Sequence, residues 1–105
     1  MADADIEIRK NDDAHRYEAF IDRDRVGFAE YQLTDQLVVF THTEVEVRCE
    51  GLGVGSALAK AALDDVRAEG GRKVLPLCPF IKGWIAHHED YQDLVYGAPR
   101  STARD

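Results

Sequence analysis

The 105-residue sequence predicts one domain of mixed α/β (α+β) class with a mainly antiparallel sheet. Two observations lead to this class. The first half holds short segments of alternating apolar and polar residues separated by turn residues, a pattern typical of strands joined by hairpins. The second half follows a glycine-rich stretch and places apolar residues at four-residue spacing, a pattern typical of helices packed on a sheet.

The strands of the first half are expected at residues 6–9, 16–21, 26–33 and 37–47. The fourth begins with four consecutive apolar residues, which favours a central strand buried on both faces. Because side chains alternate at period two along a strand, we expect His42 and Glu44 to share a face with Phe40.

A long helix is expected at residues 55–69. Leu58, Ala62 and Val66 recur there at four-residue spacing and form one apolar stripe. The pair that begins at Gly70 supplies the stop signal, since glycine readily adopts the conformation that ends a helix.

The rest of the chain is expected to form one more strand and two short helices. The strand, residues 73–77, lies parallel to the fourth strand if the long helix is a right-handed crossover. The helices are expected at 79–87 and 89–95. Residues 98–105 lack periodicity and are expected to be a disordered tail, which leaves residues 1–97 as the domain.

The net charge of −7 is unevenly distributed. Residues 1–50 hold thirteen acidic and six basic side chains, whereas residues 51–105 hold seven of each. An acidic surface repels nucleic-acid phosphates and favours a cationic partner such as an amine. The composition therefore argues against a nucleic-acid-binding function.

Location and metal content are also constrained by the sequence. No segment approaches the roughly twenty apolar residues of a membrane span, and we expect a cytoplasmic protein with no membrane partner. Cys49 and Cys78 are expected as reduced thiols, because no secretory signal accompanies them. No histidine and cysteine spacing typical of a structural metal site occurs.

The most informative segment is a glycine-rich stretch between a strand and a helix. Gly51, Gly53 and Gly55 alternate, and a helical pattern begins near Ser56. Glycines let a ligand approach the backbone, and a helix start offers unpaired N–H donors, so this stretch predicts a pyrophosphate site. The spacing differs from that of dinucleotide folds, and no lysine follows the glycines as in a P-loop.

The stretch from Glu50 to Gly55 resembles the acetyl-coenzyme A loop of GNAT-type (GCN5-related) N-acetyltransferases, [Q/R]-x-x-G-x-[G/A]. Gly53 and Gly55 match this motif, whereas Glu50 stands where Gln or Arg is usual, and we expect its carboxylate to point away from the loop. With His42-Thr43-Glu44-Val45, Cys78-Pro79-Phe80 and Glu89-Asp90-Tyr91, residues 6–95 resemble the small single-domain branch of this family.

The resemblance implies a GNAT-like fold and transfer of an acetyl group from acetyl-coenzyme A to an amine-bearing small molecule or protein. The cofactor-binding residues that it implies are Val45, Val47, Gly51, Gly53, Val54, Gly55 and Ser56. In that family the backbone of the fourth strand near residues 45–47 is usually bulged and polarises the thioester carbonyl. A carboxylate at Glu50 beside a pyrophosphate calls for a compensating positive charge, and the alternatives for it are Arg48, Lys60 and Lys82.

Four side chains are candidates for catalysis. Glu44 or His42 could take a proton from the ammonium of the acceptor. Cys78 ends the fifth strand and could accept the acetyl group if a neighbour such as His42 lowers the pKa of its thiol. In this family a tyrosine of the C-terminal helix often protonates the departing thiolate, and Tyr91, which matches it by approximate position, could do so here. Each candidate also has a structural alternative. His42 and Glu44 could be ordinary solvent-facing polar residues, Cys78 an inert buried residue, and Tyr91 an aromatic anchor for the last helix.

Two other functions stay open on the sequence alone. We expect no counterpart in this sequence of the extra helices and C-terminal strands that shape the acceptor site in full-length GNAT folds, so the acceptor could be large, bound across a homodimer, or absent. In the last case the chain would be an acyl-coenzyme A binding or sensing module. The other alternative is acetyl transfer through a Cys78 acyl-enzyme.

Overall fold

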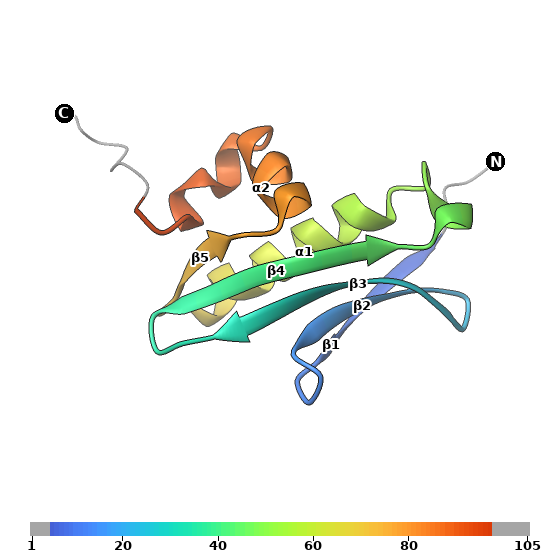
Figure 1. Cartoon of the computed structure of the whole chain (residues 1–105), viewed down its shortest axis with the longest axis horizontal. Coiled ribbons are helices and arrows are strands. Elements are labelled where there is room, and N and C mark those ends of the chain that lie inside the picture. Colours follow the sequence, from blue (N-terminus) through green and yellow to red (C-terminus); the bar gives the residue numbers. More distant parts are fainter. Residues whose placement is uncertain (1–4, 98–105) are drawn as a thin grey trace.

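The computed structural model describes residues 5–97 as a five-stranded sheet with its helices on one side (Figure 1). The strands are β1 (Ile6–Asn11), β2 (Arg16–Ile21), β3 (Asp24–Leu33), β4 (Leu37–Val45) and β5 (Lys73–Pro76). The α-helices are α1 (Val54–Glu69) and α2 (Pro79–Ala86), and the 3₁₀ helices are η1 (Val47–Cys49) and η2 (Glu89–Leu94). The strands follow chain order, with β1 to β4 antiparallel and β5 parallel to β4, which confirms the predicted mixed fold.

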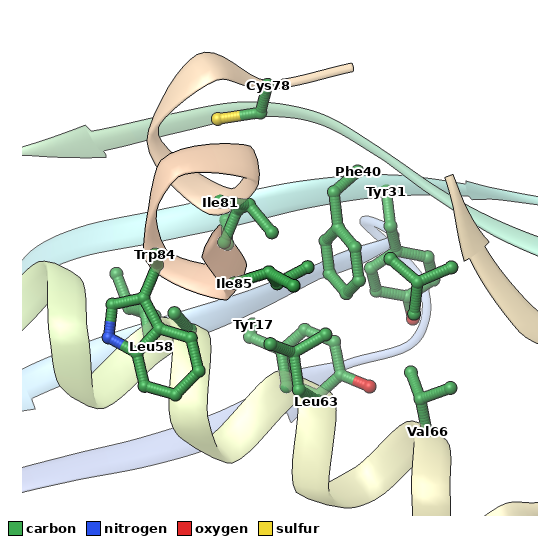
Figure 2. Packing of buried hydrophobic residues seen from close by; sticks show 14 of the residues in the cluster. Tyr17, Tyr31, Phe40, Leu58, Leu63, Val66, Cys78, Ile81, Trp84 and Ile85 are labelled. Carbon is green, nitrogen blue, oxygen red and sulfur yellow. The ribbon is translucent and has the colours of Figure 1, made fainter. Parts of the chain in front are cut away.

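Both α-helices pack on the same face of the sheet. The buried stripe of α1, which includes Leu58 and Leu63, lies against Phe40 of β4, and Ile81 and Trp84 of α2 join the same cluster (Figure 2). The helix ends as predicted at Gly70, whose φ is 70° and whose amide donates to the Val66 carbonyl. The single core therefore fixes both helices against the strand that carries most of the candidate site.

A β-bulge at Thr41 corrects the predicted faces of β4. Phe40 pairs with Tyr31 and His42 pairs with Glu30, so Thr41 is an extra residue on its strand. One extra residue reverses the alternation. Phe40 is fully buried on the helix face, whereas His42 is exposed on the opposite face, which we call the outer face. Period-two alternation could not show this reversal.

The end of β4 also differs from the prediction. The strand stops at Val45 rather than at residue 47, because the last amide that donates to β3 is that of Glu46, to the Val26 carbonyl. The chain then turns into η1, so Val47 lies in a 3₁₀ helix with 80% of its surface exposed. The bulge expected near residues 45–47 is at Thr41 instead.

The short helix expected at 89–95 is a 3₁₀ helix. The helix η2 ends at Leu94, and Val95 forms a parallel bridge with Val74 of β5. The Tyr96 amide donates to the Val74 carbonyl and extends this pairing. The tail predicted at residues 98–105 lies outside the described residues.

Candidate functional site

The strands β4 and β5 separate beyond Phe40. Its carbonyl accepts the amides of both Leu77 and Cys78, at 3.0 and 2.9 Å, and these are the last contacts of β5 with the β4 backbone. The chain then turns into α2, whereas β4 continues to Val45. The edge of β4 from Thr41 onward consequently has no strand partner on the β5 side among the described residues.

The backbone of this free edge points into the gap between the strands. Because the Glu46 amide donates to Val26 of β3, the alternate residues Thr43 and Val45 direct their N–H and C=O groups away from β3. An extended ligand beside β4 can pair with these groups in the way that an added strand would. The position of Val45 therefore suits the role implied by the family resemblance.

Thr43 and Cys78 face each other across the start of the gap. The hydroxyl oxygen of Thr43 lies 3.3 Å from the sulfur of Cys78, which is a free thiol with 3% of its surface exposed. Cys78 is the N-cap residue of α2, followed by a proline at the first helical position. The helix start thus holds the thiol beside β4. Cys49, the other free cysteine, is buried in η1.

His42 and Glu44 form a pair on the outer face of β4. The His42 Nε2 atom lies 2.8 Å from Glu44 Oε2, and the two side chains are 51% and 63% exposed. The His42 ring also lies 6.0 Å from the ring of Phe28 on β3. Since Thr43 is on the opposite face, the structure brings the two predicted proton acceptors together and separates them from Cys78 by the thickness of the strand.

A concavity of about 210 Å³ adjoins Glu44, at the place where β3 begins and β4 ends. Its lining residues are Arg25, Val26, Gly27, Phe28, Glu44, Val45 and Glu46. Of these groups, the Glu44 carboxylate is the one that attracts a cation. Glu46 already pairs with Arg48, and the Arg16 guanidinium lies over the Phe28 ring. An ammonium placed in this concavity would lie next to the His42 and Glu44 pair.

The predicted glycine-rich loop forms an open cradle of amides. Gly51 and Gly53 both have a φ of 88°, a left-handed conformation that side chains other than glycine rarely adopt. Gly53 is the N-cap of α1 and its carbonyl accepts the first helical bond, from Ala57. The amides of Val54, Gly55 and Ser56, the first three of the helix, therefore lack a helical acceptor, and no side chain caps them.

The start of α1 also contacts α2, which the sequence analysis did not predict. A Cβ atom on Gly55 would lie 2.7 Å from Cζ of Phe80, so this position leaves room for the ring. The Trp84 Nε1 atom donates to Ser56 Oγ at 2.9 Å. Phe80 and Trp84 are four residues apart on one side of α2, a spacing that could have identified them as the face toward α1.

Of the three alternatives for a compensating cation, two have carboxylate partners. Arg48 pairs with Glu46, and Lys60 pairs with Asp64 four residues along α1. Among residues 5–97, the Lys82 ammonium on α2 has no carboxylate within salt-bridge distance. Glu50 is the exposed residue that follows η1.

Tyr91 is tied to α1. Its hydroxyl donates to Asp64 at 2.7 Å, and this hydrogen bond raises the pKa of the Tyr91 phenol. The ring lies edge-on to Trp84, with centroids 5.1 Å apart. Asp64 is ten residues after Val54, about 15 Å along the helix from its start. These contacts favour the anchoring role over the role of an acid at the thioester.

Metal binding and membrane insertion are two other classes of function to which the described residues are relevant. Within residues 5–97 no three metal-binding side chains lie close enough together to hold an ion. In the same part of the chain no helix is both long and apolar enough to cross a bilayer.

Comparison with known proteins gives a family match and several similar structures. A family model described as GCN5-related N-acetyl-transferase matches residues 16–94. The solution structure of a GCN5-like protein from Staphylococcus aureus aligns with a TM-score of 0.66 and 21% identity over 100% of both chains. The crystal structure of ribosomal-protein-alanine N-acetyltransferase from Brucella melitensis biovar Abortus 2308 aligns with a TM-score of 0.58 and 15% identity over 96% of both chains. The search of curated proteins gave no significant match.

Proposed function

The chain belongs to the GCN5-related N-acetyltransferase family, and on that premise we propose that it transfers the acetyl group of acetyl-coenzyme A to a primary amine. The observation that carries this proposal is the combination of an open amide cradle at the start of α1 with a free edge of β4 beside it. The cradle suits a diphosphate, and the edge suits the extended pantetheine arm that follows it.

The diphosphate would bind the backbone of the glycine-rich loop. The amides of Val54, Gly55 and Ser56 are unpaired within the helix, and the N-terminal end of a helix dipole favours negative charge. Gly51 and Gly53 keep the approach open, because no atom lies within 4 Å of where a Cβ would be at either position. The side chain of Val47 is exposed next to this loop and would contact the cofactor's apolar part.

The thioester would lie in the gap between β4 and β5. Backbone groups of Thr43 and Val45 point into this gap and could pair with the pantetheine amides and the thioester carbonyl. A donor fixed before the reaction stabilises the negative charge that develops on the carbonyl oxygen without reorganisation. The amine nitrogen forms a bond to the carbonyl carbon, the C–S bond breaks, and the electron pair leaves with the coenzyme A sulfur.

The proton of the amine would pass to Glu44, with His42 as its hydrogen-bonded partner. Both lie on the outer face, which α1 and α2 leave open, so an amine could reach the gap from that side. The concavity that adjoins Glu44 would hold the ammonium before it loses a proton, directly or through one water.

The Thr43–Cys78 contact favours one second candidate, a covalent route. In that route the Cys78 thiolate attacks the thioester carbonyl and coenzyme A leaves as its thiolate. The amine then attacks the acetyl-cysteine and releases the cysteine sulfur. Against it, the Cys78 thiol is nearly fully buried, and His42 lies on the other face of β4.

Calorimetry and a thiol-release assay together test the proposal. We expect acetyl-coenzyme A and coenzyme A to bind with one-to-one stoichiometry, and free thiol to appear when amines are added from a panel of diamines, amino acids and basic peptides. Binding without thiol release on any amine would instead indicate an acyl-coenzyme A binding or sensing module. A protein that binds neither compound would refute both readings.

A further inference from the structure

The only tryptophan of the chain lies next to the amide cradle. Trp84 is on the second turn of α2 and exposes 9% of its surface, and its Nε1 atom donates to Ser56 Oγ at 2.9 Å. Ser56 is the third residue of α1 and is itself exposed. A buried side chain therefore directs its one polar atom at a residue of the cradle.

This hydrogen bond determines what the Ser56 hydroxyl can still do. A serine hydroxyl has one proton to donate, whereas an indole N–H can only donate. Ser56 Oγ must therefore accept from Trp84, and its own proton needs an acceptor elsewhere. Among residues 5–97 no acceptor receives it. Because Cβ atoms lean toward the helix N-terminus, this hydroxyl leans toward the end of α1 at which the first backbone amides lack a helical acceptor.

We propose that Trp84 is a positioning residue that fixes the Ser56 hydroxyl as a side-chain donor to the diphosphate of coenzyme A. This inference rests on the proposed function. The indole occupies the lone pair of Ser56 Oγ that faces α2 and so leaves the proton to point at the ligand. A hydroxyl that accepts one hydrogen bond also becomes a stronger donor in the next one, since successive hydrogen bonds polarise each other.

Neighbouring rings hold the indole in this position. The His88 ring stacks on it with centroids 3.7 Å apart and planes 10° apart, and Tyr91 meets it edge-on. The His88 ring in turn is tied to the Trp84 carbonyl through Nδ1 at 2.6 Å. One turn earlier on α2, the ring of Phe80 fills the space beside Gly55. These contacts restrict rotation of the indole, as a positioning role requires.

Replacing a single atom tests the proposal. Because the chain has one tryptophan, biosynthetic incorporation of β-(3-benzothienyl)alanine exchanges only the Trp84 N–H for sulfur and keeps the shape of the ring. The dissociation constant for coenzyme A is measured for this protein, for Ser56→Ala, for the two changes combined and for Ser56→Thr. Thermal unfolding of each variant checks that it is folded.

We expect the isosteric replacement and Ser56→Ala each to weaken coenzyme A binding about tenfold, the loss of one hydrogen bond to a charged group. The combined protein should bind no more weakly than either alone, and Ser56→Thr should bind within about threefold of the wild type because it keeps the hydroxyl. The single indole N–H resonance should move when coenzyme A saturates the wild type and should stay fixed in Ser56→Ala.

Either of two results would overturn the positioning role. One is wild-type affinity in the isosteric protein, and the other is a combined loss equal to the product of the single losses. If the unmodified protein binds no coenzyme A, the proposed function itself has failed and this inference fails with it. If the unmodified protein binds and the isosteric one binds equally well, only the role of Trp84 is refuted.

Discussion

The sulfur of Cys78 lies 3.3 Å from the hydroxyl oxygen of Thr43, at the point where β4 and β5 separate. This contact places a thiol and a hydroxyl at the inner side of the gap in which the thioester is proposed to bind. The predicted proton acceptors, His42 and Glu44, are on the outer side of the same strand. The strand β4 thus divides the proposed site into a cofactor side and an acceptor side.

Direct transfer predicts that Cys78 stays unmodified. After incubation with acetyl-coenzyme A alone, the intact mass of the protein should be unchanged, and Cys78→Ala should keep measurable thiol release with amines. An increase of one acetyl group that disappears in Cys78→Ala would instead establish the covalent route. Cys49→Ala is the matched control, because it removes the other buried free thiol.

Gly53→Ala should weaken coenzyme A binding. A side chain at a φ of 88° is strained by about 1–2 kcal/mol, and relaxing that strain would rotate the amides of the cradle. Gly70→Ala is the control, since it puts at least as much backbone strain at the other end of α1, where φ is 70° and ψ is 173°. Calorimetry should show weaker binding only for Gly53→Ala, while thermal unfolding shows both variants to be less stable. Equal affinities in the two variants would argue against the cradle.

Glu44→Gln should lower kcat by about a hundredfold, the usual contribution of a general base, and leave the KM for acetyl-coenzyme A unchanged. The amide keeps the size and hydrogen-bonding reach of the carboxylate but cannot accept the proton. Glu7→Gln serves as the control, because Glu7 is an exposed carboxylate paired with Arg9 on the outlying strand β1. A Glu44→Gln variant with wild-type kcat would exclude this residue as the base.

Glu18 should make folding sensitive to acid. Burial alone would raise the pKa of Glu18, but hydrogen bonds from Arg16, Asn11 and Arg25 lower it below its ordinary value of 4.5. A carboxyl whose pKa is lowered in the folded state stabilises the protein at neutral pH, and that contribution is lost as the pH falls through the folded-state pKa.

The variant Glu18→Gln isolates this contribution. At pH 7 it should unfold with a free energy lower by about 1–3 kcal/mol, because a hydrogen-bonded charge is lost. The difference from the wild type should shrink as the pH falls below 4.5, the ordinary value for this group. Urea titrations at several pH values measure it. A difference that does not depend on pH would assign the effect to packing instead of charge.

The strand order, the crossover helix and the glycine-rich loop could be predicted because each has a local signature. Apolar alternation marks the strands, and Gly53 and Gly70 stand at the two ends of α1. These features depend on residues close together in the sequence, where propensity and periodicity are informative.

The two faces of β4 could not be predicted, because the bulge at Thr41 depends on pairing with β3. A single extra residue leaves no mark on the composition of the strand and still moves His42 away from Phe40. The contacts of Trp84 with Ser56 and of Tyr91 with Asp64 join residues that are 28 and 27 positions apart in the sequence. Such pairs follow from helix packing and have no local signature.

The most direct test of the central claim is a titration of isotopically labelled protein with coenzyme A, followed through the backbone amide resonances. The account predicts that the amides of residues 51–56 shift and saturate together, while those around Gly70 at the far end of α1 stay in place. Unchanged resonances for residues 51–56 at saturating coenzyme A would contradict it.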